Sequence, residues 1–416
     1  MQMLAPRKLC TIALTLTGCA LAFAQPISLE TAWQRALSAT PEGLVWEEER
    51  AAIDGTVDQA GRLPNPVLDT ELENFGARRP YRGFDDGELT VRLRQDIVRR
   101  QKRAVARRAA AAAGPVAEAE YKIRIADLRE RVANAYNALF VAQEQAALAE
   151  DAVALAMRIA QSTQRLHAAG QATGVEVSRA NLEIASARSK ASAAAKALEA
   201  AKKALVAQWV GGPDEDLAAV SVVTPSSLGA PWAGDLEMLQ VKLDASPEIQ
   251  LFDAEAERRR AETEVEKQRS TRDIGLSAGV RFLRKDENAT AVVGIEVPLF
   301  VHNRYDSAVA AARARARQVE HQKLSATIRL KADLSSRFAT LASARNEIQT
   351  LESSVLPAAM EVVQRSQAAF DQGQATFLQL LEAQRALLDT REQRLAALQQ
   401  FLEASVAIER LLGNVI

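Results

Sequence analysis

DIGLSAGVRFL, residues 273–283, alternates between two kinds of side chain along its whole length. Apolar side chains fall on one face of the extended chain, and glycine, serine and arginine fall on the other. Residues 289–299 and 89–97 alternate in the same way, and residues 66–75 do so less cleanly. The sequence therefore predicts four amphipathic strands of about ten residues each. In the stretch 273–283 the apolar positions are Ile274, Leu276, Ala278, Val280 and Phe282.

Strands that are apolar on one side and polar or charged on the other are typical of an outer-membrane β-barrel with a wet lumen. A sheet covered by helices in a soluble protein explains the same alternation, so the pattern alone leaves both open. Four strands cannot close a membrane barrel, because the smallest have about eight. An open edge in lipid would leave backbone groups without hydrogen-bond partners. A barrel would therefore need several chains, and three copies supply twelve strands.

Two stretches of the chain are long enough to form helices longer than any compact domain. Residues 99–167 contain one interior breaker, the pair Gly114-Pro115, and residues 304–371 contain only Pro357. A helix of about 69 residues would extend ~100 Å at 1.5 Å per residue. Aromatic residues are only 5% of the chain, and closely packed long helices do not need them. The expected fold is mainly α with a small β part, in which the helices form a rod or an α-barrel.

A leucine at every seventh position marks the last predicted helix. This spacing predicts a coiled-coil seam over three heptads, and an amphipathic helix in an ordinary bundle is the alternative. The leucines are Leu381, Leu388, Leu395 and Leu402.

The chain repeats itself at a spacing of roughly 200 residues. The tetrad at 170–173, Gly-Gln-Ala-Thr, recurs unchanged at 373–376. Each half has the same predicted order: a helix, two strands, a very long helix, a glycine turn and another helix. We therefore expect one repeat at 25–212, a second at 236–416, and a linker rich in proline and glycine at 213–235.

The N-terminus, residues 1–24, has the features of an export signal: Arg7 and Lys8, then an apolar stretch and small residues. Cleavage after Ala24 and a lipoprotein box ending at Cys19 are both compatible with the sequence. Cleavage after Ala24 would also remove Cys10, and with it every thiol. Without Arg7 and Lys8 the 52 basic residues fall to 50 against 53 acidic ones, a net charge of −3, which gives no reason to expect nucleic acid as a partner. No later segment has the uninterrupted apolar length of a membrane-spanning helix.

Residues 61–66 (GRLPNP), followed by residues 71–76 (ELENFG), together with the repeat and the strand order, resemble the TolC-like outer-membrane efflux family. Within that family they resemble the heavy-metal subgroup of the cobalt–zinc–cadmium type. The resemblance implies a homotrimer with a twelve-stranded β-barrel in outer-membrane lipid and a long periplasmic α-barrel. It also implies a periplasmic adaptor and an inner-membrane pump of the RND type as partners. The basic run at 99–103 (RRQKR) departs from the glycine–lysine run typical of the family.

The resemblance places the periplasmic mouth of the channel at the two glycine turns. Acidic and polar side chains that would narrow this aperture are Glu382, Gln379 and Glu176. Three copies of Glu382 around one axis would repel each other and attract cations; solvated charges on a helix surface are the alternative for Glu382 and Glu176. The residues expected to form the turns and to contact an adaptor are Gly170, Gly174, Gly373, Thr376, Phe377 and Leu378.

Neither a resident metal nor an enzymatic reaction is expected. The three histidines, His167, His302 and His321, lie far apart in the sequence, and pairs at the spacing of a zinc site are absent. A nucleophile elbow, a phosphate-binding loop and a histidine-centred acid–base set are absent as well. The expected function is export of divalent heavy-metal cations, without a cofactor. The alternatives are a TolC-type duct for drugs or secreted proteins and a periplasmic coiled coil without a pore.

Overall fold

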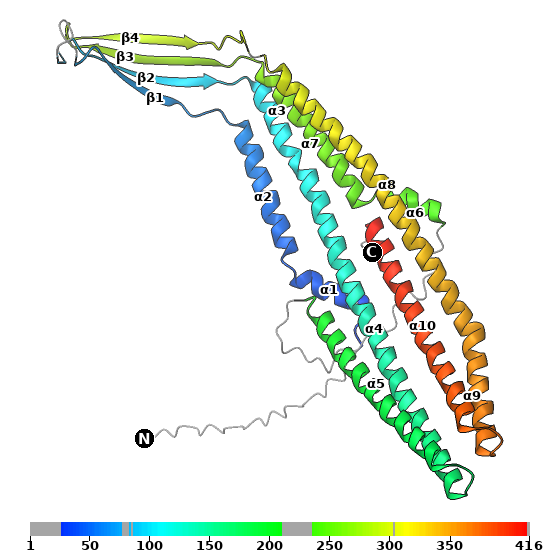
Figure 1. Cartoon of the computed structure of the whole chain (residues 1–416). Helices are drawn as coiled ribbons and strands as arrows, with labels where there is room; N and C mark the ends of the chain where they lie inside the picture. Colours follow the sequence, from blue (N-terminus) through cyan, green and yellow to red (C-terminus); the bar gives the residue numbers. More distant parts are fainter. Residues whose placement is uncertain (1–25, 77–82, 85, 210–234, 303, 414–416) are drawn as a thin grey trace, which may run out of the picture.

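A four-stranded sheet extends from one end of a long bundle of helices in the computed structural model of the chain (Figure 1). The structure describes residues 26–76, 83–84, 86–209, 235–302 and 304–413. The predicted signal peptide at 1–24 lies outside these residues. The predicted linker at 213–235 also lies outside them, except for Asp235.

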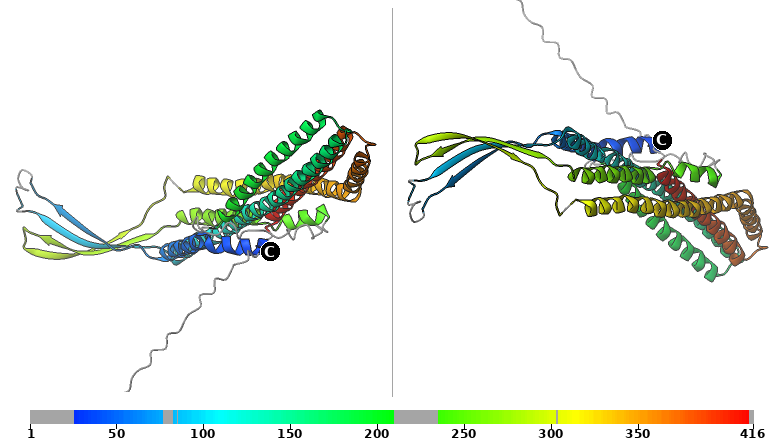
Figure 2. Two further views of the ribbon diagram at one scale, coloured as in Figure 1. Left: turned by 90° about the horizontal axis from the view of Figure 1, so that it is seen from below. Right: turned by 90° about the horizontal axis from the view of Figure 1, so that it is seen from above.

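The sheet is made equally from the two halves of the chain. Its strands are β1 (Val67–Glu73), β2 (Glu88–Ile97), β3 (Ile274–Leu283) and β4 (Asn288–Glu296), antiparallel and in the order β1-β2-β3-β4. The central pair joins segments that are far apart in the sequence, with Val91 opposite Val280. Strands β1 and β4 are the two edges, and all four strands project away from the helices (Figure 2).

The register places the apolar positions of all four strands on one face. Leu68 lies opposite Leu93, which lies opposite Ala278, which lies opposite Val293. Many of these side chains are exposed; Leu68 is 68% and Val293 79% exposed. The opposite face is polar and ion-paired. Arg92 bridges Asp69 (3.2 Å) and Glu71 (2.9 Å), and Arg281 and Arg94 pair with Glu73, Glu88 and Glu296.

The predicted strands exist, but their ends differ from the predicted ones. The fourth strand ends at Glu296 and not at residue 299. Pro298 lies just beyond this end, and a proline has no N–H to donate to a neighbouring strand. The first strand begins at Val67, directly after Pro66, and ends at Glu73.

The helices follow the same order in both halves of the chain. In the first half they are α1 (Leu29–Ala39), α2 (Glu42–Gly61), α3 (Arg100–Ala111), α4 (Ala113–Ala168) and α5 (Gly174–Val206). In the second half they are α6 (Leu236–Leu243), α7 (Pro247–Arg269), α8 (Asp306–Thr350), the π-helical turn η3 (Leu351–Val355), α9 (Leu356–Asp371) and α10 (Phe377–Leu412). The fold is therefore mainly α with a small β part, as predicted. The boundaries of the two repeats, 25–212 and 236–416, stay a prediction.

Both long helical stretches continue past their proline with a local irregularity. In the first, Ala112 separates α3 from α4, three residues before Pro115. In the second, a π turn directly precedes Pro357, and the N–H of Leu356 donates to the carbonyl of Leu351. Since a proline cannot donate and its ring crowds the preceding turn, both helices change their hydrogen bonding there without ending.

The main core lies between the middle of α4 and α10, with α1 packed against α4 and with α6 and α8 packed against α10 (Figure 1). Tyr136 of α4 is 1% exposed, and its hydroxyl donates to the carbonyl of Ile27 at 3.1 Å. The predicted leucine seam of α10 faces this packing, because Leu395 and Leu402 are buried. Within the part of the chain that the structure describes, no helix is both long enough and apolar enough to cross a membrane.

Beside this core, Arg410 of α10 links three helices. It forms ion pairs with Asp127 (2.9 Å) and Glu130 (3.8 Å) of α4 and with Glu248 in the first turn of α7. The neighbouring Glu409 is largely buried, and this burial raises the pKa of its carboxyl group, opposed by the charge of Arg129. The two halves of the chain are thus joined by ion pairs here as well as by the sheet.

Candidate functional site

The tips of the helical bundle, at the end opposite the sheet, are two turns with the same backbone structure (Figure 1). Gly170 and Gly373 have positive φ values of 75° and 71°. In each turn the glycine N–H donates to a carbonyl three residues back, and the next N–H donates to one five residues back, at 2.8–2.9 Å. This is a Schellman ending, in which glycine avoids the steric cost of a left-handed conformation. Gly174 differs from the prediction, because it is the first residue of α5 and not part of the turn's left-handed backbone.

A capping box begins the helix that follows each turn. The Thr173 hydroxyl accepts from the N–H of Glu176 (3.3 Å), and the Glu176 carboxylate accepts from the N–H of Thr173 (2.7 Å). Thr376 and Gln379 form the same pair of bonds at 3.3 and 2.9 Å. Glu176 and Gln379, predicted as aperture residues, therefore hold the helix starts. The sequence carries the signal for this, since Thr-x-x-Glu and Thr-x-x-Gln are capping-box patterns.

The two tips pack against each other through a small apolar cluster. Phe370 and Phe377 meet edge to face, with ring centroids 6.4 Å apart, and bury the end of α4 beneath them. Phe377 is 2% exposed, so its ring is not available to another protein; this corrects its predicted role in adaptor contact. His167 Nδ1 lies 2.8 Å from the carbonyl oxygen of Ala172, within hydrogen-bond distance across the first turn.

Two apolar side chains and one carboxylate near the tips are exposed. Leu378 is 50% exposed, and Val175, which occupies the equivalent position in the first repeat, is 63% exposed. Glu382 is exposed in the second turn of α10, and its side chain makes no hydrogen bond or ion pair with the described residues. The tips therefore present two equivalent apolar side chains and one carboxylate to solvent. A single chain does not bring Glu382 and Glu176 together.

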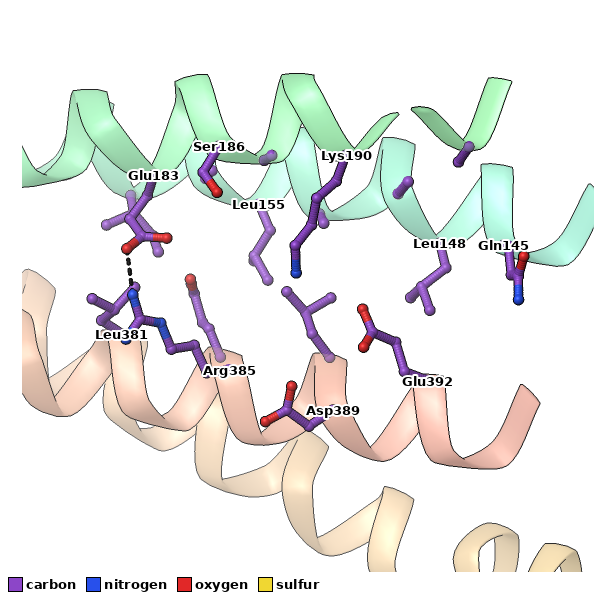
Figure 3. Close-up of a pocket in the computed structure, with 18 of the residues that line it drawn as sticks. Gln145, Leu148, Leu155, Glu183, Ser186, Lys190, Leu381, Arg385, Asp389 and Glu392 are labelled. Carbon is purple, nitrogen blue, oxygen red and sulfur yellow. Dashed lines mark hydrogen bonds and ion pairs between the residues drawn. The ribbon is translucent and has the colours of Figure 1, made fainter. Parts of the chain in front are cut away.

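A cleft of about 480 Å³ lies above the tips, lined by α4, α5 and α10 (Figure 3). Its lining is mixed: Leu148 and Leu155 of α4 point into it, and the charged side chains of Lys190 and Glu392 also line it. Glu183 of α5 and Arg385 of α10 form an ion pair of 2.5 Å across one end. Such an exposed pair contributes about 0–1 kcal/mol to stability. Helices α5 and α10 are therefore tied together only weakly at this point, and a shift of α10 relative to α5 would break few interactions.

None of these groups forms a metal centre. Among the described residues, no three His, Cys, Asp or Glu side chains are grouped so that they could hold a metal ion. The exposed groups of the tips are suited to attracting or repelling ions and to contacting other helices.

This arrangement of two repeats, a shared sheet and paired helical tips matches known proteins. The model of the outer membrane efflux protein family matches residues 33–211 and 238–414. The chain belongs to this family. The predicted resemblance is thereby confirmed, and so is the predicted location in the outer membrane.

Among characterised relatives, the chain is 31% identical over 178 residues to the cobalt-zinc-cadmium resistance protein CzcC of Cupriavidus metallidurans. The match covers 43% of this chain and 43% of CzcC, so it spans less than half of that relative.

Solved structures agree over much more of the chain. The outer membrane protein VceC of Vibrio cholerae matches with a TM-score of 0.73 at 19% identity, covering 92% of this chain and 96% of VceC. CusC matches with a TM-score of 0.71 at 17% identity, covering 94% of this chain and 93% of CusC. The CmeC outer membrane channel of Campylobacter jejuni matches with a TM-score of 0.70 at 14% identity, covering 92% of this chain and 85% of CmeC. At these identities the likeness shows the shared fold.

Replacing Thr376 by Ala should loosen the start of α10, because the N–H of Gln379 loses its acceptor. Loss of a threonine cap costs about 1 kcal/mol, so the amides of residues 377–380 should exchange roughly fivefold faster with deuterium. Hydrogen-exchange mass spectrometry of the purified protein would measure this. Thr376→Ser keeps the hydroxyl and should exchange at nearly the wild-type rate. Equal protection in the alanine variant would show that the cap does not hold the tip.

Proposed function

We propose that three copies of the chain form one channel, in which their sheets close a twelve-stranded barrel and their helices a periplasmic tube. The sheet carries this proposal. Its apolar face is exposed on all four strands, and its two edges, β1 and β4, have no neighbour among the described residues. A lipid-exposed sheet must be closed, since unpaired backbone groups cost several kcal/mol each in hydrocarbon. If β4 of one copy pairs with β1 of the next, the backbone groups of both edge strands gain hydrogen-bond partners.

The proposed cargo is divalent heavy-metal cations, delivered by a periplasmic adaptor and an inner-membrane pump of the RND type. Two observations support it. The first is the similarity to CzcC over 178 residues. The second is the charge on the polar face of the sheet, where carboxylates outnumber guanidinium groups. The carboxylates are Asp69, Glu71, Glu73, Glu88, Asp96 and Glu296, and the guanidinium groups are those of Arg92, Arg94 and Arg281. This face would line the lumen and favour cations.

The mouth is proposed to lie at the tips, where Glu382 forms a ring of three around the axis. The carboxylate of Glu382 is exposed and engaged by no other group in the described chain, which supports a role toward solute. Glu176 and Gln379 hold the helix starts on which the ring depends. The exposed Val175 and Leu378 next to both turns support contact with an adaptor, since both positions repeat around a trimer to give six apolar contacts.

The assembly can be tested by mass. Detergent-solubilised protein should have roughly three times the mass of one chain, because four strands cannot close alone. Size-exclusion chromatography with light scattering measures this mass. A monomer that still conducts ions in planar bilayers would contradict the trimer.

The cargo can be tested by growth. A strain that lacks the gene should tolerate lower concentrations of zinc, cobalt or cadmium, and plasmid-borne wild-type protein should restore growth. A panel of drugs, tested beside the metals, should inhibit the deletion strain and its parent equally. Sensitivity to the drugs with unchanged tolerance of metals would instead identify a drug duct.

The mouth can be tested by conductance. Glu382→Gln should lower the preference for cations and weaken block by divalent ions at least about fivefold, since one charge at 4 Å contributes about 1 kcal/mol even in water. Planar-bilayer reversal potentials and titrations with a divalent salt measure both. Glu264→Gln is the control, because Glu264 lies on α7 near the sheet and pairs with Lys267 at 2.5 Å. If the two variants behave alike, Glu382 is an ordinary surface charge.

A further inference from the structure

Six arginines at the junction of the sheet and the helices are exposed and make no ion pair or hydrogen bond through their side chains within the described chain. We call them the junction arginines: Arg99, Arg100, Arg107, Arg108, Arg272 and Arg304. Elsewhere at this end of the helices the pattern differs, because Arg258, Arg259 and Arg260 of α7 are all paired with glutamates. A concentration of unpaired arginines is costly in self-repulsion and suggests a negatively charged partner outside the chain.

Three junction arginines lie on one face of α3. Arg100, Arg107 and Arg108 are spaced by seven and eight residues, which places them on one side of a helix. Two further basic residues of α3 make their contacts within the chain. Lys102 pairs with Asp273 at 2.5 Å, and Arg103 donates to the carbonyl of Gly61 at 3.1 Å. The basic run at 99–103 is therefore divided into internal contacts and an outward-facing charged surface.

The junction arginines begin where the exposed apolar face of the sheet ends. Arg99 follows Ile97, the last residue of β2, by two positions, and Arg272 precedes Ile274, the first residue of β3, by two. Ile97 is 43% and Ile274 39% exposed. Two residues is the repeat of an extended strand, so both arginines continue the side of the sheet that carries the apolar residues.

Aromatic rings lie at the same level. The guanidinium of Arg272 lies 6.0 Å from the centre of the Phe300 ring, and Phe300 meets Tyr305 edge to face at 5.8 Å. Aromatic residues are enriched where the apolar band of a membrane barrel meets the headgroups. The junction arginines, the aromatic rings and the end of the apolar face therefore lie at the same boundary between the sheet and the helices.

We propose that the junction arginines bind the phosphate groups of anionic lipids in the periplasmic leaflet of the outer membrane. Guanidinium groups bind phosphate through two parallel hydrogen bonds. Each basic residue near an anionic membrane surface attracts it, and the apolar face above the arginines would contact the acyl chains of the same lipids. The proposal rests on insertion of the sheet into the membrane, as in the proposed channel. The bound lipids would fix the depth at which the channel sits.

Native mass spectrometry of the detergent-solubilised protein, titrated with short-chain phosphatidylglycerol, tests this proposal. The triple variant R100Q/R107Q/R108Q should bind phosphatidylglycerol at least about tenfold more weakly than the wild type. The control R188Q/K196Q/K203Q removes the same charge from exposed positions of α5 and should bind like the wild type. Phosphatidylcholine, which carries no net charge, should bind more weakly than phosphatidylglycerol. Added salt should weaken binding of phosphatidylglycerol to the wild type, a result that does not depend on how the variant folds.

Equal affinities of both variants for phosphatidylglycerol, or binding that is insensitive to salt, would overturn the proposal. So would displacement of the lipid by inorganic phosphate at equal concentration, which would identify a phosphate site and not a lipid surface. The mass measured in the same spectra separates this result from the proposed function. A trimer that does not distinguish the lipids leaves the channel intact, whereas a wild-type monomer contradicts the channel.

Discussion

The unpaired edges of the sheet are the constraint on which the rest of the structure depends. Backbone N–H and C=O groups at an edge have no partner in hydrocarbon, so a sheet with an exposed apolar face must find another strand at each side. In this chain β2 and β3, from opposite halves, satisfy each other in the centre and leave β1 and β4 open. The duplicated plan follows from this, because each half supplies one inner and one outer strand together with the helices that continue from them.

The sequence predicts the strands and long helices because both leave a periodic signal that local packing does not override. Residues 273–283 alternate with period two, and the long helices contain few breakers. The features that the sequence does not predict depend on single hydrogen bonds. Pro298 shortens β4, and a π turn interrupts the regular helix just before Pro357. The pairing of Val91 with Val280 could not be predicted from local pattern, because it depends on contact between segments far apart in the sequence.

The candidate site was predictable in position but less so in the roles of its residues. The repeated tetrad marks both turns, and Gly170 and Gly373 adopt positive φ there. The charge of Glu176 and the polarity of Gln379 suggest aperture residues, but their spacing from Thr173 and Thr376 makes them capping residues. Phe377 lies in the same short segment as Leu378, yet helical periodicity turns one inward and the other outward. Of the six junction arginines, only Arg99 and Arg100 belong to the basic run at 99–103. Arg272 and Arg304 are distant from that run in the sequence, and only the fold brings them to the same junction.

A duct must attract its cargo without retaining it, and the polar face of the sheet meets both requirements. Arg92 and Arg281 each bridge two carboxylates and so prevent neighbouring acids from acting together on one ion. Within the described residues no group of three suitable side chains could hold a metal. The excess of carboxylates nevertheless leaves a negative surface, which raises the local concentration of cations at long range. Weak attraction spread over many residues permits entry and release, whereas a single tight site would slow release. If the cargo is divalent metal cations, as proposed, selection among metals would have to occur before the cargo reaches this chain.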